Sequence, residues 1–153
     1  MMDRTDKKIL NLLQQNCSLS TAEIAERIGL STTPCWRRIQ NLEKNGVIQK
    51  RVALLDRKTI NLGVDVFVAI KTRHHNAEWL DKFAEAVSSF SEVVEFYRMS
   101  GDIDYLMRVV VPDINAYDRF YKRLIEKVDI QDVSSSFAME QIKYTTALPV
   151  DYA

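Results

Sequence analysis

The 153-residue chain has no net formal charge, and with 46% hydrophobic and 27% charged residues it has the composition of an ordinary globular protein of one or two domains. No segment reaches the ~20 apolar residues of a membrane span, and residues 1–8 lack the apolar core of a secretory signal, so we expect a cytoplasmic protein without a membrane partner. The two cysteines, Cys17 and Cys35, are too few for a disulfide framework and lack C-x-x-C spacing, so we expect both to be reduced.

The neutral total hides an uneven distribution of charge. Residues 1–60 contain 11 Lys and Arg against 6 Asp and Glu, whereas residues 61–153 contain 10 against 15. Asymmetry of this kind indicates a basic module followed by an acidic one. The sequence therefore predicts two domains with these boundaries, and the basic balance of the first is compatible with a nucleic-acid partner.

The first domain begins with two predicted helices. Residues 3–15 carry apolar side chains at helical spacing, which favours an amphipathic helix. A second helix is expected over residues 21–28, because Ser20 and Glu23 have the S-x-x-E spacing of a capping box. We expect this helix to end at Gly29, since glycine accepts the left-handed conformation at a helix end without strain.

A third helix is predicted between residues 31 and 44. Pro34 falls in its first turn, where the missing N–H costs little, and Asn45-Gly46 ends it. Residues 47–55 have a β-like apolar pattern around the basic pair Lys50-Arg51, and we expect them to form a ribbon. The third helix is expected to bury four side chains: Cys35, Trp36, Ile39 and Leu42.

The second and third helices are joined by a short turn that contains glycine, which is the pattern of a helix-turn-helix whose second helix enters the major groove of DNA. Arginine suits guanine, asparagine and glutamine suit adenine, and threonine suits bases or phosphates. Basic residues after the helix suit backbone phosphates. The predicted DNA-binding residues are Thr32, Thr33, Pro34, Arg37, Arg38, Asn41, Lys44, Lys50 and Arg51, with Gln40 on the same exposed side. The pattern alone leaves open a solvated basic helix in an ordinary three-helix bundle.

Six elements are expected in the second domain, after a linker near residues 56–63. Their order is βαββαβ, which is the ferredoxin-like plan of two helices on one face of an antiparallel sheet. The predicted fold class is α+β, with an N-terminal winged helix-turn-helix followed by a ferredoxin-like domain. The predicted strands are residues 64–72, 93–99, 103–111 and 133–144, and the predicted helices are residues 77–90 and 113–128.

Ser100 to Asp104 is a tight acidic turn between two predicted strands. Gly101 permits close approach to the backbone, and Asp102 and Asp104 have carboxylates that accept hydrogen bonds from an ammonium group. From the residues alone a plain β-turn is the preferred interpretation, because Gly-Asp is common turn chemistry.

Short motifs occur in a characteristic order along nearly the whole chain. Leu-Ser-Thr-Thr-Pro-Cys-Trp-Arg-Arg occupies residues 30–38, and Ser-Gly-Asp-Ile-Asp-Tyr-Leu occupies residues 100–106. Together these motifs resemble the Lrp/AsnC (feast/famine) family of transcriptional regulators. The other stretches that carry the resemblance are residues 42–43, 46–48, 52–56, 135–137 and 143–146.

The resemblance implies a role for each domain. It implies an N-terminal domain that binds double-stranded promoter DNA, and a C-terminal domain that dimerises and senses a free amino acid, with no other cofactor. It also implies dimers that read palindromic half-sites and associate into octamers. Residues 71–79 and 135–146 resemble a branch of the family that responds to cysteine.

The resemblance also implies an effector pocket, built around the Gly-Asp turn and the last strand near the place where dimers meet. Carried over by position, the effector-binding residues are Gly101, Asp102, Asp104 and Tyr105, with Ser136, Phe137 and Ala138 opposite and Ile114 nearby.

The rival class is an enzyme or metabolite-binding module on the ferredoxin-like plan, because fold does not settle function. Neither histidine falls in the predicted pocket, and no P-loop, G-x-S-x-G or H-E-x-x-H motif occurs. His74 and His75 are adjacent, and adjacent strand residues point to opposite faces, so we expect no metal site there. We therefore expect a regulator that is not an enzyme.

Overall fold

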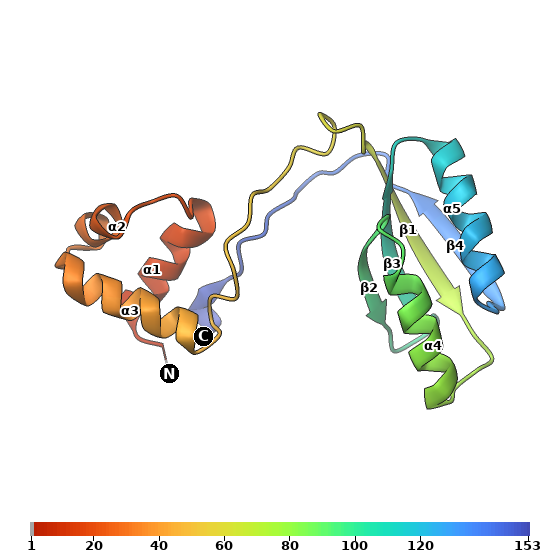
Figure 1. The fold of residues 1–153 in the computed structure, drawn as a ribbon, viewed down its shortest axis with the longest axis horizontal. Coiled ribbons are helices and arrows are strands. Elements are labelled where there is room, and N and C mark those ends of the chain that lie inside the picture. The colour runs from red at the N-terminus through yellow and green to blue at the C-terminus, as the bar shows by residue number, and fades with distance from the viewer. Residues whose placement is uncertain (1) are drawn as a thin grey trace. The chain divides into compact units, whose positions relative to one another are not determined.

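The computed structural model describes residues 2–153, which form two compact units (Figure 1). One unit contains the chain up to Leu54 together with Ile142–Ala153, and the other contains Leu55–Gln141. The predicted division into residues 1–60 and 61–153 therefore differs at the C-terminus. The last twelve residues return to the first unit, which a division of the chain into consecutive segments does not anticipate.

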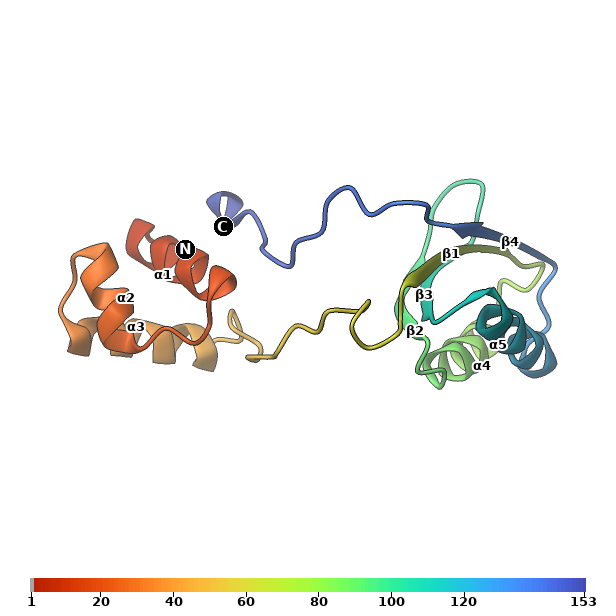
Figure 2. The ribbon, with the colours of Figure 1, turned by 90° about the horizontal axis from the view of Figure 1, so that it is seen from above.

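Three helices and a short 3-10 helix make up the N-terminal unit. They are α1 (Arg4–Gln15), α2 (Thr21–Ile28), α3 (Thr32–Lys44) and η1 (Val150–Tyr152). Figure 2 shows α1, α2 and α3 from above. The three predicted helices are confirmed to within one residue at each end. Their shared core consists of Ile9, Leu10, Leu13, Leu19, Ile24, Ala25, Cys35, Ile39 and Leu42.

Capping boxes hold the starts of α1 and α2. The predicted box is present, since the Glu23 backbone N–H donates to Ser20 Oγ and the Ser20 N–H donates to Glu23 Oε2 at 2.7 Å. That donor from the Ser20 backbone lowers the pKa of Glu23. Gly29 ends α2 with φ 69°, in the left-handed region where glycine is favoured. These local hydrogen bonds explain why the helix boundaries were readable in the sequence.

The predicted ribbon over residues 47–55 is wrong for the chain as the structure describes it. No strand is assigned there, and Leu54 and Leu55 are exposed. The prediction that the last strand continues to Tyr144 is also wrong, because it ends at Phe137. A strand needs a neighbouring strand for its backbone groups, and neither stretch pairs with one among residues 2–153.

The second unit has the predicted βαββαβ order. Its sheet is antiparallel with strand order β2-β3-β1-β4, and both helices cover one face (Figures 1 and 2). The ferredoxin-like plan is thereby confirmed. The elements are β1 (Val64–Lys71), α4 (Ala77–Ser88), β2 (Val93–Arg98), β3 (Tyr105–Val111), α5 (Ile114–Lys127) and β4 (Asp132–Phe137).

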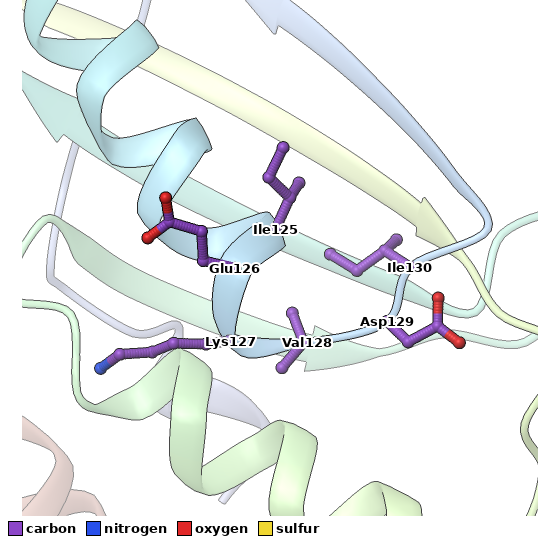
Figure 3. Close-up of a pocket in the computed structure, with 6 residues that line it drawn as sticks. All are labelled: Ile125, Glu126, Lys127, Val128, Asp129 and Ile130. Atoms are coloured by element: carbon purple, nitrogen blue, oxygen red, sulfur yellow. The ribbon is translucent and has the colours of Figure 1, made fainter.

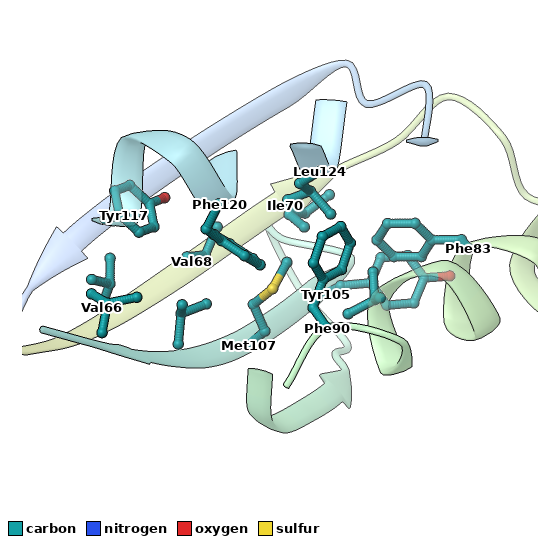
Figure 4. Close-up of a cluster of buried hydrophobic side chains, with 13 residues drawn as sticks. Val66, Val68, Ile70, Phe83, Phe90, Tyr105, Met107, Tyr117, Phe120 and Leu124 are labelled. Carbon is teal, nitrogen blue, oxygen red and sulfur yellow. The ribbon is translucent and has the colours of Figure 1, made fainter. Parts of the chain in front are cut away.

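The core of this unit lies between the sheet and the two helices (Figure 4). Val66, Val68 and Ile70 alternate along β1 toward the helices, as the period of two requires. Phe83 on α4 and Phe120 on α5 are fully buried against them. Burial of each such side chain contributes roughly 1.5–3 kcal/mol.

The sheet face opposite the helices is partly polar. Arg108 on β3 lies 2.9 Å from Asp65 on β1 and 3.2 Å from Glu95 on β2. Phe67 and Tyr97 on this open face are 40% and 52% exposed. The open face thus carries a line of ion pairs flanked by uncovered aromatic rings. Among the described residues, no helix is both long and apolar enough to cross a membrane.

Candidate functional sites

The outward face of α3 is the surface opposite its buried residues. Successive helical residues are 100° apart, so Arg37 and Lys44 lie about 180° from the buried Cys35, Ile39 and Leu42. Thr33, Gln40 and Asn41 share this outward face, and all five side chains are exposed. The structure therefore brings together the predicted residues Thr33, Arg37, Asn41 and Lys44 on one helix.

The first turn of α3 differs from the first turns of α1 and α2. Ser31 is its N-cap residue by backbone geometry but makes no side-chain capping bond, and the turn contains no acidic residue. Helices α1 and α2, in contrast, each have a side-chain capping bond and an acidic residue in the first turn. Thr32, Thr33 and Pro34 are exposed there. The first turn of α3 thus keeps the partial positive charge of a helix start, which favours an anion.

Arg38 lies on the flank of α3 and not on its outward face. Its Nη1 lies 2.6 Å from Asp3 Oδ2 and 2.8 Å from Asp6 Oδ1, and these two carboxylates form the capping box of α1. The Asp6 backbone N–H, followed by the Arg38 guanidinium, lowers the pKa of Asp3. Arg38 is one of the predicted DNA-binding residues, and in the structure it joins α3 to the start of α1.

Trp36 was predicted to be buried, and this prediction is wrong because its side chain is 52% exposed. It follows Cys35 and is therefore turned about 100° away from the centre of the core. The sequence favoured burial because tryptophan is large and apolar. The angular spacing from Cys35 and Ile39 was the signal that placed it at the edge of the helix face.

The two basic residues after α3 have different surroundings. Arg51 Nη2 lies 3.0 Å from Glu43 Oε1, and Arg51 Nη1 donates to the Cys17 carbonyl oxygen at 3.4 Å. Lys50 is exposed. Arg51 therefore ties the segment after α3 back to the helical unit.

The eight predicted effector residues fall into two groups at opposite ends of the sheet. Tyr105 pairs with Ile70, at the end of β1 where the Gly101–Asp104 turn lies. Phe137 pairs with Val66, toward the other end of the same strand. Four residues of strand separate the two levels, which is about 13 Å at 3.3 Å per residue. One chain thus does not bring the two groups together.

The Gly-Asp end is held by hydrogen bonds around Asp104. The Asp104 Oδ2 accepts from the Thr72 backbone N–H at 2.8 Å, and the Asp104 N–H donates to the Ile70 carbonyl at 2.9 Å. Gly101 has φ 118°, a conformation that strains other residues. Asp102 is exposed and Tyr105 is buried. The turn is therefore fixed to β1 and Thr72 by hydrogen bonds of Asp104, and it exposes the carboxylate of Asp102.

The other end contains side chains on both faces of the sheet. Ser136 lies opposite Phe67 on the open face, whereas the Phe137 ring packs edge-on against Tyr117 at 5.2 Å between centroids. The Tyr117 hydroxyl also forms a hydrogen bond with Ser135 Oγ, and burial raises the pKa of the Tyr117 hydroxyl. Ile114 is 67% exposed and Ala138 is exposed.

Two surface hollows lie beyond the end of α5. The larger, of about 350 Å³, is lined by residues 125–130 (Figure 3). The smaller, of about 170 Å³, is lined by Arg73, His74, Asp129 and Gln131. None of the predicted effector residues lines either hollow. Across residues 2–153, no group of three or more His, Cys, Asp or Glu side chains is arranged to hold a metal ion.

The fold joins a helix-turn-helix unit, formed by α2 and α3, to a ferredoxin-like domain. The family description "Winged helix-turn-helix DNA-binding" matches residues 2–49, and "Lrp/AsnC ligand binding domain" matches residues 65–148. The chain belongs to the Lrp/AsnC family of transcriptional regulators. It is a DNA-binding regulator with an amino acid ligand-binding domain.

Similarity to individual proteins extends over the whole chain. A crystal structure of an AsnC family transcriptional regulator from Agrobacterium tumefaciens is 66% identical with a TM-score of 0.97, over 99% of both chains. The DNA-binding transcriptional activator DecR of Escherichia coli is 53% identical, over 99% of this chain and 100% of DecR. A complex of the Neisseria meningitidis regulator NMB0573 with L-Met is 36% identical with a TM-score of 0.94, over 99% of both chains. All three of these relatives are transcriptional regulators.

Proposed function

We propose that the outward face of α3 reads specific DNA sequences. The observation that supports this proposal is the grouping of four exposed side chains on the face of α3 opposite its buried residues. They are Thr33, Arg37, Asn41 and Lys44. Arginine and asparagine present the paired donors and acceptors that distinguish guanine and adenine in the major groove.

The remaining predicted DNA-binding residues have supporting roles in this proposal. Thr32 and Pro34 lie in the first turn of α3, whose N–H groups favour a phosphate. Lys50 contacts the DNA backbone after the helix. Arg38 and Arg51 position α3 and the segment after it through their ion pairs.

Binding to a promoter fragment and to random DNA of equal length tests this proposal. Fluorescence anisotropy across a salt series gives the dissociation constants, and we expect specific binding to be at least ~10³-fold tighter than non-specific binding at physiological salt. Equal affinity for both fragments contradicts it.

We propose that the effector is a single free amino acid, with L-cysteine as the first candidate. The family match over residues 65–148 and the L-Met complex of the Neisseria protein support an amino acid. The resemblance of residues 71–79 and 135–146 to a cysteine-responsive branch supports cysteine. Thermal-shift measurements with each of the twenty amino acids test this, and a clear preference for leucine or asparagine contradicts the choice of cysteine.

The two groups of predicted effector residues support a site shared between copies. A second chain brings its Ser136, Phe137 and Ala138 against Gly101, Asp102, Asp104 and Tyr105 of the first, with Ile114 near the former group.

The exposed Phe67 and Tyr97 on the open face support pairing of copies. We propose dimers that read two half-sites and associate into octamers, acting in the cytoplasm without enzymatic activity. Sedimentation velocity measures the assembly, and a monomer at micromolar concentration contradicts it.

Asp104 is the residue on which the effector proposal depends most. Asp104→Ala should abolish the response of DNA binding to the amino acid while sparing DNA binding itself. Asp104→Asn is the matched control, because it keeps an acceptor for the Thr72 N–H and removes the charge. An unchanged response in both variants contradicts the proposed role of the carboxylate.

A further inference from the structure

The C-terminal segment of the chain is bound to helix α1. Gln14 Nε2 donates to the Leu148 carbonyl at 3.1 Å, and the Leu148 N–H donates to Gln14 Oε1 at 2.6 Å. The side-chain amide of Gln14 thereby satisfies both backbone groups of Leu148, as a neighbouring strand does in a sheet. Lys7 Nζ adds a third bond to the Asp151 carbonyl at 3.1 Å.

An apolar contact completes this attachment. Val150, the first residue of η1, packs against the buried cluster of the N-terminal unit. The terminal residues of a chain lose conformational freedom when they are ordered, so a short free end stays bound only when its contacts offset that loss. Val150 and the three hydrogen bonds supply these contacts.

The origin of this segment gives the attachment a consequence for regulation. The segment leaves β4 directly after Phe137, and β4 pairs with β1. The proposed effector residues Ser136, Phe137 and Ala138 therefore stand at the start of the segment. A ligand that holds or shifts them acts on a chain whose other end is bound to α1.

Helix α1 is also joined to α3. Arg38 joins α3 to Asp3 and Asp6 at the start of α1, and Gln14 lies in the last turn of the same helix. Helix α1 thus contacts the C-terminal segment through Lys7 near its start and Gln14 in its last turn, and its first residues carry the ion pairs to Arg38 of α3. The same helix therefore touches both the C-terminal segment and the brace of α3.

We propose that the surface of α1 formed by Lys7 and Gln14, beside the core contact of Val150, is the docking surface for residues 148–151, and that amino acid binding is transmitted to the DNA-reading helix through this contact. Gln14 and Lys7 are positioning residues in this proposal, since neither belongs to the proposed DNA-reading face or to the proposed effector site. The transmission rests on the proposed effector site, whereas the docking itself rests only on the contacts of α1.

Gln14→Ala in the 153-residue chain and a chain that ends at Ala147 test the proposal. The matched control is Gln15→Ala, because Gln15 is the exposed neighbour on α1 and makes no side-chain hydrogen bond among the described residues. Two measurements are made on each variant. The first is amide exchange at Leu148, and the second is the ratio of operator dissociation constants with and without millimolar L-cysteine or L-methionine.

We expect slow exchange of the Leu148 amide in the wild type and in Gln15→Ala, and fast exchange in Gln14→Ala. We expect an effector-induced change in operator affinity on the order of 10-fold in the wild type and Gln15→Ala, within the usual range of coupling between sites. That ratio should fall to about 1 in Gln14→Ala and in the shortened chain.

Different failures overturn different parts. Equal exchange of the Leu148 amide in the wild type and Gln14→Ala overturns the docking. A wild-type ratio retained by both variants overturns the transmission. A wild type whose operator affinity changes with none of the twenty amino acids overturns the proposed effector function, and with it the transmission, while Leu148 exchange still decides the docking.

Discussion

The DNA-reading face and the proposed effector site differ in how much of each a single chain supplies. Thr33, Arg37, Asn41 and Lys44 occupy one face of one helix, so one chain presents them together. Asp104 lies in the turn before β3, whereas Ser136 lies on β4 toward the other end of the sheet. Helical periodicity places the first group of residues together, and the proposed effector site needs a second chain to complete it. Proximity in sequence therefore grouped the residues of the first proposed site, and it did not group those of the second.

The two units also stand on separate cores. Ile9 belongs to the core of the N-terminal unit and Phe120 to the core of the second, and neither residue appears in the other cluster. Each unit also contains one of the two tryptophans, Trp36 and Trp79. The fluorescence of each tryptophan, measured with the other replaced by Phe, therefore reports the unfolding of one unit.

Phe120→Ala should have the largest effect among the changes that separate the two regions. The side chain is fully buried, and removal of a buried Phe costs about 3–5 kcal/mol. We expect the unfolding transition reported by Trp79 fluorescence to have its midpoint at a much lower denaturant concentration. The midpoint of the transition reported by Trp36 should not change. Ile9→Ala is the control and should reverse the pattern. A shift of both signals by the same amount would show that the units unfold together.

Arg37→Ala and Arg38→Ala compare a residue proposed to contact a base with a residue that joins α3 to α1 through ion pairs. Arg37→Ala should weaken operator binding by about 1–3 kcal/mol, with the loss confined to one base position. Arg38→Ala should weaken binding to all sequences alike, because its guanidinium holds Asp3 and Asp6.

The salt dependence of binding checks this assignment. Lys50→Ala, which removes a proposed phosphate contact, should reduce the slope of log Kd against log salt by about 1, whereas Arg38→Ala should leave the slope unchanged. A reduced slope in Arg38→Ala, with wild-type thermal stability, would return Arg38 to the DNA contacts.

Mixing two inactive variants tests whether the effector site is shared between copies. Asp104→Ala and Ser136→Trp should each lose the amino acid response alone. In a mixed dimer with shared sites, one site carries both substitutions and the other carries neither, so about half the response of the mixed dimers should return. Co-expression followed by operator titration measures it. No recovery would mean that each site lies within one chain.

The smallest expected effect concerns acid stability of the N-terminal unit. The pKa of Asp3 is lowered in the folded chain by the Asp6 N–H and by Arg38. A lowered pKa contributes stability that is present above the unfolded value of about 3.9 and is lost as pH falls through the folded value. Asp3→Asn keeps a capping oxygen and removes the charge. Its acid unfolding, followed by Trp36 fluorescence, should depend less steeply on pH below about 4.

The sequence by itself determined the features that depend on neighbours a few residues away. The Ser20–Glu23 box, the turn at Gly29 and the outward placement of Arg37 follow from local hydrogen bonds and a period of 3.6 residues. The strand predicted over residues 64–72 is confirmed as β1, which ends one residue earlier, at Lys71. The order of these elements then indicated both domains.

Only the tertiary structure decided which distant groups meet. It paired Arg38 with Asp3 and Asp6, left residues 47–55 without a strand partner, and returned Leu148 to Gln14 across more than a hundred residues. Such contacts depend on how packed elements bring separate segments together, which no local pattern records. For this protein, the helix proposed to read DNA was therefore predicted from the sequence, whereas the ion pairs that brace it and the contact of the C-terminal segment with α1 became visible only in the fold.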